Sequence, residues 1–116
     1  MFSKTKKILN VLLEHHKLTC ISNKFSEVPI TTFLITYGKL QKKTGIAINL
    51  YSIGPYLDDI ATWCFENGYP PLNALAVNSA SQEPGEGYDL AEGCSTETWE
   101  IDVERVIEYR GYPTVV

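Results

Sequence analysis

Residues 54–68, GPYLDDIATWCFENG, decide the fold because they mark a helix at both of its ends. Pro55 stands in the first turn, where a proline loses no helical hydrogen bond. Asn67 and Gly68 supply a helix stop. Ser52 could instead begin this helix one turn earlier. The apolar face of the predicted helix consists of Leu57, Ile60, Ala61 and Cys64.

Downstream of this helix, the sequence predicts a buried strand and then a turn-rich loop. Pro70 and Pro71 exclude a continuing helix. Residues 72–77, LNALAV, form a short apolar run that is typical of a strand. Residues 78–87 are polar and contain one proline and two glycines, so we expect a hairpin or a wing there.

Two more helices are predicted upstream. Ser3 is a suitable N-cap for a helix that runs to about His16. A shorter helix, over residues 37–44, lies between an N-cap at Thr36 and a stop at Gly45. The apolar face of the first helix consists of Ile8, Leu9, Leu12, Leu13 and His16.

The last predicted element is a helix from about Thr96 to Tyr109. Its start is ambiguous because apolar residues recur there both at alternate positions and at helical spacing. Gly111 and Pro113 form a conventional helix stop, and a run of about fifteen residues is long for a strand.

Together these elements predict one small domain over residues 1–116. We expect the α/β class in its mainly helical, α+β form. The expected architecture is a helix-turn-helix-like core with a short sheet or wing and a C-terminal helix. Residues 17–31 give no readable element, and Pro29 makes a continuous helix through them unfavourable.

Cysteine usage and hydropathy favour a cytoplasmic protein. The longest mainly apolar stretch near the start, residues 8–13, is too short to span a membrane, and no small-residue cleavage site follows it. Cys20, Cys64 and Cys94 are an odd number without ligand-like spacing, which argues against a disulfide framework and against a zinc site. A reducing cytosol fits these features, and we expect neither a signal peptide nor membrane binding.

Charge is sorted along the chain. Residues 1–43 hold eight lysines against two glutamates, a formal charge of +6. Residues 44–116 hold two arginines against twelve acids, a formal charge of −10. Because a charged face steers association and rejects like-charged surfaces, the second half should repel nucleic acid.

Several short motifs follow one another in the order found in a known DNA-binding family. They are Thr36-Tyr37-Gly38-Lys39-Leu40, Gly45, Ser52-Ile53-Gly54, Leu75-Ala76-Val77 and Gly87-Tyr88. Over about residues 31–90 the chain thus resembles the winged-helix domain of the DNA alkylguanine transferases and alkyltransferase-like proteins. The resemblance implies that the helix after Thr36 opens a helix-turn-helix, and that the helix after Gly54 is the one that enters the DNA groove.

The chain departs from that family at its functional positions. Residues 72–75, LNAL, stand where the family carries its reactive cysteine, so we expect no alkyl transfer. Tyr51 stands where the family has the arginine that enters the DNA stack. The helix that would read DNA carries Asp58, Asp59 and Glu66, which would repel phosphates.

No other motif predicts catalysis, a metal or a cofactor. His15, His16 and Cys20 are sequence neighbours without a fourth ligand, so we interpret the histidines as surface and helix-end residues. Cys64 lies on the apolar face near a helix C-terminus, where the dipole raises a thiol pKa, and we interpret it as a core cysteine. We therefore predict no catalytic residues.

Acidic residues are concentrated in the turn-rich stretch and beyond it, and their spacing does not fit a calcium loop. A solvated surface without any partner is one interpretation. The other is a protein-binding patch, because Tyr88, Trp99 and Tyr109 are interspersed with the acids. The candidate protein-binding residues are Asp58, Asp59, Glu66, Glu83, Glu86, Tyr88, Asp89 and Glu92.

Two functional hypotheses follow. In the first, the protein binds and neutralises a basic protein partner, possibly a nuclease toxin. In this small, acidic character it resembles bacterial immunity proteins, which cover a cationic active site. In the second, it is a winged-helix nucleic-acid-binding protein without alkyltransferase activity, and its phosphate contacts are Lys4, Lys6, Lys7, Lys39, Lys42 and Lys43. The identity of the partner, the binding face and the oligomeric state are open at this point.

Overall fold

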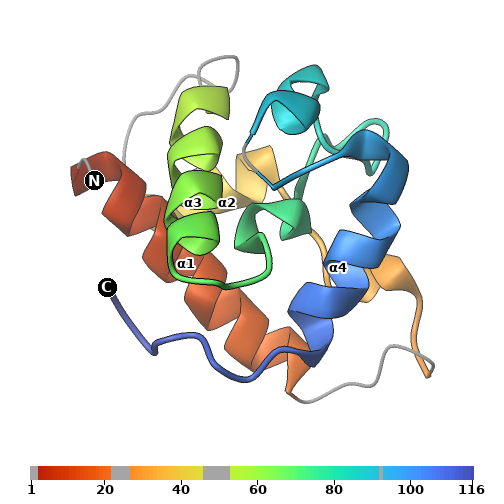
Figure 1. Cartoon of the computed structure of the whole chain (residues 1–116), viewed down its shortest axis with the longest axis horizontal. Coiled ribbons are helices and arrows are strands. Elements are labelled where there is room, and N and C mark those ends of the chain that lie inside the picture. Colours follow the sequence, from red (N-terminus) through yellow and green to blue (C-terminus); the bar gives the residue numbers. More distant parts are fainter. Residues whose placement is uncertain (1–2, 22–26, 46–52, 92) are drawn as a thin grey trace.

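Helices dominate the computed structural model, which describes residues 3–21, 27–45, 53–91 and 93–116 (Figure 1). The α-helices are α1 (Ser3–Cys20), α2 (Tyr37–Thr44), α3 (Gly54–Glu66) and α4 (Trp99–Glu108). The short 3₁₀ helices are η1 (Ile30–Thr32), η3 (Leu72–Leu75), η4 (Glu86–Leu90) and η5 (Thr96–Thr98). The strands β1 (Ile35–Thr36) and β2 (Ala76–Val77) pair in parallel, with Ile35 opposite Ala76.

The first helix is longer than the sequence predicts. The expected apolar face is confirmed, and it continues for one more turn to Cys20, which is fully buried. The backbone oxygen of Cys20 accepts a hydrogen bond from the Arg110 guanidinium at 3.0 Å. This contact between residues far apart in the sequence satisfies a terminal carbonyl of α1. No sequence pattern near Cys20 predicts it.

Helices α2 and α3 begin and end where their capping residues predict. The Thr36 hydroxyl accepts from the Lys39 backbone N–H at 3.2 Å, and Gly45 ends α2 with a φ of 68°. Helix α3 begins at Gly54 and is capped at Asn67, after which Gly68 has a φ of 72°. Such left-handed conformations cost glycine little, which is why these helices stop there. The alternative start at Ser52 lies outside the described residues.

The strand predicted over residues 72–77 is mostly wrong. Its first four residues form η3, and only Ala76 and Val77 pair as a strand. Its predicted burial is confirmed, because Leu72, Ala74, Leu75 and Val77 are each fully buried. A fully apolar run does not distinguish a buried strand from a buried helical turn.

The hairpin predicted over residues 78–87 is also wrong. Within this stretch the backbone N–H of Gln82 donates to the carbonyl of Asn78, and the N–H of Asn78 donates to the carbonyl of Glu83. These bonds close a compact turn in which Gln82 has a φ of 57°. Residues 86–87 belong to η4, so the stretch contains no pair of antiparallel strands.

The C-terminal helix is confirmed, although its first turn is the 3₁₀ helix η5. The buried residues follow the helical pattern: Trp99, Val103, Val106 and Ile107 are each at most 8% exposed. The indole N–H of Trp99 donates to the carbonyl of Ala74 at 2.9 Å, which joins α4 to η3. Figure 1 shows η3 in the middle of the molecule, between α3 and α4.

One hydrophobic core joins all four α-helices, so the fold class is a small, mainly helical domain with a two-stranded parallel sheet. The radius of gyration is 12.7 Å, and a compact chain of this length has about 13 Å. In the described parts of the chain, every helix is too short or too polar to cross a membrane.

Candidate functional site

A hollow of about 180 Å³ lies at the start of α3, where this helix meets η3, α2 and the loop before η4. Its apolar walls include Tyr37, Leu57 and Ala76. Gly54 and Gly87 also line it and are exposed, so the hollow lies at the surface. It therefore collects residues from α2, α3, η3, β2 and η4, which are spread over residues 37–90.

One wall of the hollow is fixed by a hydrogen bond between α2 and the loop. The backbone N–H of Gly85 donates to the Tyr37 hydroxyl at 2.8 Å. Burial raises the pKa of Tyr37, so this hydroxyl keeps its proton at neutral pH. The hydroxyl thus holds residues 84–87 over the start of α3.

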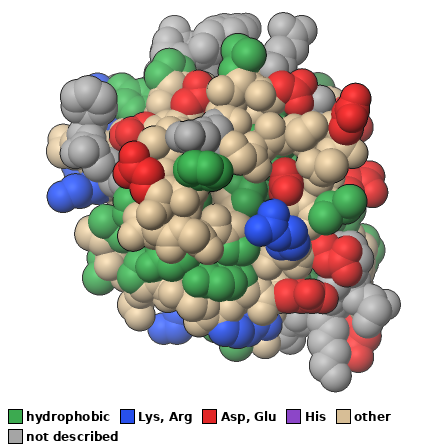
Figure 2. Space-filling view, in the orientation of Figure 1, with side chains coloured by type: hydrophobic (Ala, Val, Ile, Leu, Met, Phe, Trp, Pro, Cys, Tyr) green, Lys and Arg blue, Asp and Glu red, His purple; other side chains and the backbone are tan. Residues whose placement is uncertain are grey.

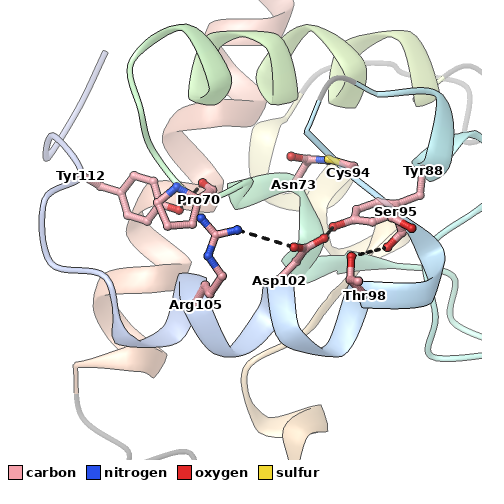
Figure 3. Close-up of polar contacts among 9 residues, drawn as sticks. All are labelled: Pro70, Asn73, Tyr88, Cys94, Ser95, Thr98, Asp102, Arg105 and Tyr112. Carbon is pink, nitrogen blue, oxygen red and sulfur yellow. Dashed lines mark hydrogen bonds and ion pairs between the residues drawn. The ribbon is translucent and has the colours of Figure 1, made fainter.

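Asn73 lines the hollow from η3 and is only 4% exposed. Its carboxamide nitrogen donates to the Cys94 sulfur at 3.7 Å, and Figure 3 shows the carboxamide oxygen on the side away from that sulfur. The oxygen is buried and accepts no hydrogen bond from any residue that the structure describes. A buried acceptor without a donor costs about 1–3 kcal/mol, and because this oxygen is closed to solvent, that cost falls on the folded state.

Asp58 adds a negative charge to the same hollow. Its side chain is half-buried, and desolvation raises the pKa of its carboxyl above the ordinary value of 3.8. Within the described part of the chain, no Lys or Arg forms an ion pair with it. The hollow thus offers the half-buried Asp58 carboxylate as a hydrogen-bond acceptor, whereas the Asn73 oxygen is closed to solvent.

Beside the hollow, Tyr88 belongs to a buried polar network (Figure 3). Its hydroxyl donates to Asp102 Oδ2 at 2.7 Å, and Arg105 Nη1 lies 3.9 Å from the other carboxylate oxygen. Tyr88 is 6% and Asp102 is 4% exposed, whereas the Arg105 side chain is 58% exposed. Burial and the neighbouring Asp102 strongly raise the pKa of Tyr88. Tyr88 therefore positions η4 against α4.

Two cysteines lie near this region as protonated thiols. Burial raises the pKa of the Cys94 thiol, whose sulfur accepts a hydrogen bond from Asn73. Burial also raises the pKa of the Cys64 thiol, to about 12. The thiolate is the reactive form of cysteine, so neither sulfur is activated at neutral pH. The interpretation of Cys64 as a core residue is confirmed by its full burial.

The structure brings two of the predicted protein-binding residues together, because Asp58 and Tyr88 both line the hollow. Asp59 is half-buried, with Oδ2 inaccessible and unpartnered among the described residues. The other candidates do not line the hollow. Glu66, Glu83 and Asp89 are exposed, the Glu86 side chain lies outside the described part of the chain, and so does Glu92.

The expectation of exposed aromatic residues among the acids is wrong for two of the three. Tyr88 and Trp99 are at most 8% exposed, and each uses its polar group within the domain. Tyr109 is half-buried and packs edge-on against Tyr112, with ring centres 4.7 Å apart. An aromatic residue that is flanked by charged residues in the sequence can therefore still belong to the core of the fold.

The candidate list from the sequence leaves out a row of acids on α4, although Glu97 and Glu100 belong to the acidic run beyond the turn-rich stretch. Glu100, Glu104 and Glu108 recur every fourth residue and therefore share one helix face, and Glu97 precedes them in η5. Glu97, Glu100 and Glu108 are exposed, and Ile101 beside them is 57% exposed. This four-residue spacing was the signal available in the sequence. Figure 2 shows one face of the whole molecule, with acidic side chains gathered over its upper and right-hand parts, including α4.

All six lysines of the alternative nucleic-acid site are exposed. Three lie in the first turns of α1 and three on α2, and these two helices pack together. Lys39 and Lys43 are close enough to His15 of α1 to help lower its pKa. The basic and acidic residues therefore lie largely on different elements.

The two histidines point to different backbone partners. His15 Nε2 is 2.7 Å from the Phe33 carbonyl, and His16 Nε2 is 2.7 Å from the Val106 carbonyl. His16 is 5% exposed, which confirms its place on the predicted apolar face, but it is not at the end of the helix, which continues to Cys20. In the described ranges, no three His, Cys, Asp or Glu side chains gather as metal ligands would.

Comparison with known proteins assigns no family. No family model matches the chain, and neither the curated proteins nor the solved structures contain a significant match.

Proposed function

We propose that this protein binds a basic protein partner through its acidic surface. The observation that carries the proposal is the row of acids on η5 and α4, in which Glu97, Glu100 and Glu108 are exposed and Glu104 is half-buried. Between residues that the structure describes, the one ion pair joins Arg105 to Asp102, so this row is not neutralised from within the domain. Unneutralised acids on one face create a field that attracts a cationic surface.

In its more specific form, the proposal is that the partner is a nuclease toxin and that this chain acts as its immunity protein. A nuclease active site is cationic because its substrate is polyanionic, so an acidic surface can cover it. Complementary charge chiefly accelerates association, which suits a protein that must capture a toxin quickly.

The test is capture from the native host followed by association kinetics. We expect the immobilised chain to recover one basic protein, and we expect its association rate to fall steeply with salt. The double variant Glu100→Lys/Glu104→Lys should slow association roughly tenfold or more, within the range that electrostatic steering spans. A captured nuclease should lose activity when the chain is added.

Glu14 offers a matched control, because it is an exposed acid on α1, within the basic half. Glu14→Lys makes the same charge change as either single variant on α4, Glu100→Lys or Glu104→Lys, and should leave the association rate nearly unchanged. Recovery of no basic protein would contradict the proposal. Equal slowing by the α4 and α1 variants would show that net charge, and not the α4 row, is responsible.

The exposed lysines on α1 and α2 favour a second candidate, a winged-helix nucleic-acid-binding protein. In this candidate, α2 and α3 would act as the two helices of a helix-turn-helix, and Lys39, Lys42 and Lys43 would supply phosphate contacts together with the α1 lysines. Asp58, Asp59 and Glu66 on α3 oppose this function, since they would face the DNA backbone.

Duplex DNA binding at low salt tests this candidate. We expect affinity to fall linearly with salt on logarithmic scales, and Lys39→Glu with Lys42→Glu should reduce both the affinity and the slope. A chain that does not bind duplex DNA even at low salt is not a nucleic-acid-binding protein of this kind.

A further inference from the structure

The exposed charges of the domain form two faces of opposite sign. The acidic face is the row on η5 and α4 that consists of Glu97, Glu100, Glu104 and Glu108. The basic face lies on α1 and α2 and consists of Lys4, Lys7, Lys39 and Lys43. All four lysines are exposed, and so are three of the four glutamates. None of these residues forms an ion pair with another residue that the structure describes, so neither face is neutralised from within that part of the chain.

The four lysines share one side of the molecule because α1 and α2 pack together. His15 follows Lys4 by about three helical turns and therefore points the same way from α1. Lys39 and Lys43 help to lower the pKa of His15, which places them close to this side of α1. The α1 and α2 lysines thus form one surface.

Each face contains one residue of the opposite sign. Glu14 lies among the lysines on α1, and the exposed Arg105 lies among the glutamates on α4. Four lysines against Glu14 leave a formal charge of +3, and four glutamates against Arg105 leave −3. The two faces are therefore opposite in sign and equal in the size of their charge.

The faces also match in length and in apolar content. Lys4 and Leu18 lie on one line of α1 that spans about 21 Å, and the row from Glu97 to Glu108 spans about 17 Å. Leu18 is 59% exposed beside the basic face, and Ile101 is 57% exposed within the acidic face. Apolar side chains with charges around them are the ordinary composition of a protein interface.

We propose that the acidic face of one copy of this chain binds the basic face of a second copy. This inference goes beyond the proposed function and does not rest on it. Figure 1 shows the N-terminal end of α1, which carries Lys4 and Lys7, on the opposite side of the molecule from α4. One copy therefore cannot pair its own two faces. Head-to-tail contacts of this kind form rings or open chains instead of a two-fold dimer.

The size of the contact sets its strength. A contact about 17 Å long and one helix diameter, about 10 Å, wide is much smaller than the roughly 800 Å² that each partner of a stable complex buries. Complementary charge chiefly accelerates association, and salt screens it. We therefore expect a reversible association with a Kd on the order of 100 µM at low salt.

Analytical ultracentrifugation of the unmodified chain is the first measurement. Between about 10 µM and about 1 mM protein, we expect the weight-average mass to rise above that of the monomer at about 20 mM salt. It should return to the monomer mass at about 500 mM salt, where the Debye length is about 4 Å. A monomer at every concentration in low salt overturns the proposal, and so does a self-association that salt does not weaken.

Two charge reversals test the faces separately. Glu100→Lys/Glu104→Lys reverses the acidic face and Lys39→Glu/Lys43→Glu reverses the basic face, so each variant alone should associate at least roughly tenfold more weakly. An equal mixture of the two variants again offers acidic faces to basic ones, and it should associate at least as strongly as the unmodified chain. Self-association of either variant at native strength, or a mixture that stays monomeric, overturns the proposal. If a double variant fails to fold, the single reversals Glu100→Lys and Lys43→Glu give the same test.

Glu66→Lys/Glu83→Lys is the matched control, because both acids are exposed and lie outside the two faces. This variant changes the net charge as much as the α4 variant does, and it should leave self-association nearly unchanged. An equal loss of self-association in the control overturns the proposal, since net charge would then explain the effect.

Self-association and the proposed function fail in distinguishable ways. Lys39→Glu/Lys43→Glu keeps the acidic face, so it should lose self-association and still capture a basic protein. If the chain stays monomeric but captures a basic protein, the self-association is wrong and the proposed function stands. If the chain self-associates through these faces and recovers no basic protein, the second copy is the partner of the acidic face and the proposed function is wrong.

Discussion

At the residue scale, the hydrogen bond from Tyr88 to Asp102 links η4 to α4. Both side chains are buried, and the 2.7 Å bond gives the carboxylate a donor where water cannot reach it. We expect Tyr88→Phe to lower the free energy of unfolding by about 1.5–3 kcal/mol, as hydrogen bonds to charged groups do. Urea unfolding with linear extrapolation measures this change.

Tyr56 provides the control for that prediction. It is half-buried and makes no hydrogen bond through its hydroxyl with the described residues, so Tyr56→Phe should change stability by less than about 0.5 kcal/mol. Adding Asp102→Asn to Tyr88→Phe should recover part of the loss in stability. The buried carboxylate that lost its donor is then replaced by a neutral amide. Additive losses in the double variant would show that the two groups are not coupled.

At the element scale, Arg110 joins the C-terminal ends of two helices. Its guanidinium donates to the Ile107 and Tyr109 carbonyls next to α4 and to the Cys20 carbonyl at the end of α1. Helix C-terminal carbonyls lack partners and carry partial negative charge, so one arginine satisfies several of them. Arg110→Lys keeps the charge but cannot bond to both helices, and we expect it to cost about 1–2 kcal/mol in unfolding free energy.

Arg105→Lys is the matched change in this helix. Arg105 is 58% exposed and its ion pair is 3.9 Å long, so we expect the loss to stay below about 0.5 kcal/mol. Native-state hydrogen exchange distinguishes the roles further, since Arg110→Lys should increase opening at the ends of both α1 and α4. If only α4 opens more readily, the bond to Cys20 contributes nothing.

The same element scale shows what sequence reasoning can and cannot predict. Helices α2 and α3 were located correctly because Thr36, Gly45 and Gly68 act on their own neighbours, and such local signals are readable in one sequence. The end of α1 and the conformation of residues 72–75 were not predicted correctly. The hydrogen bond from Arg110 to the Cys20 carbonyl decides the first, and the packing of η3 between α3 and α4 decides the second. Those contacts come from distant parts of the chain.

At the scale of the whole molecule, charge segregation could be predicted by counting, but the candidate site could not. Asp58 was a candidate because of its charge. Asn73 was named only as part of the apolar run LNAL and was not a candidate site residue. The hollow depends on contacts such as the bond between Tyr37 and Gly85, which are 48 residues apart. A site built from such contacts emerges only when the fold is known.

The two histidines make the stability of the whole domain depend on pH. Desolvation lowers the pKa of His15 and His16 below the ordinary value of 6.5, and nearby cations, including Lys43 for His15 and Arg110 for His16, lower it further. Well above pH 6.5 neither the folded nor the unfolded chain holds these protons. As the pH falls through 6.5, the unfolded chain takes up protons that the folded chain resists, so folding becomes less favourable.

We therefore expect the free energy of unfolding to fall between about pH 7.5 and about pH 5.5, and the double variant His15→Gln/His16→Gln to flatten that dependence. Asp58 acts in the opposite direction, because its raised pKa favours the folded state at low pH, but its titration begins from an ordinary value of 3.8. Urea unfolding across this range measures the effect. An unchanged pH dependence in the double variant would show that the bonds of these histidines to Phe33 and Val106 are not linked to protonation.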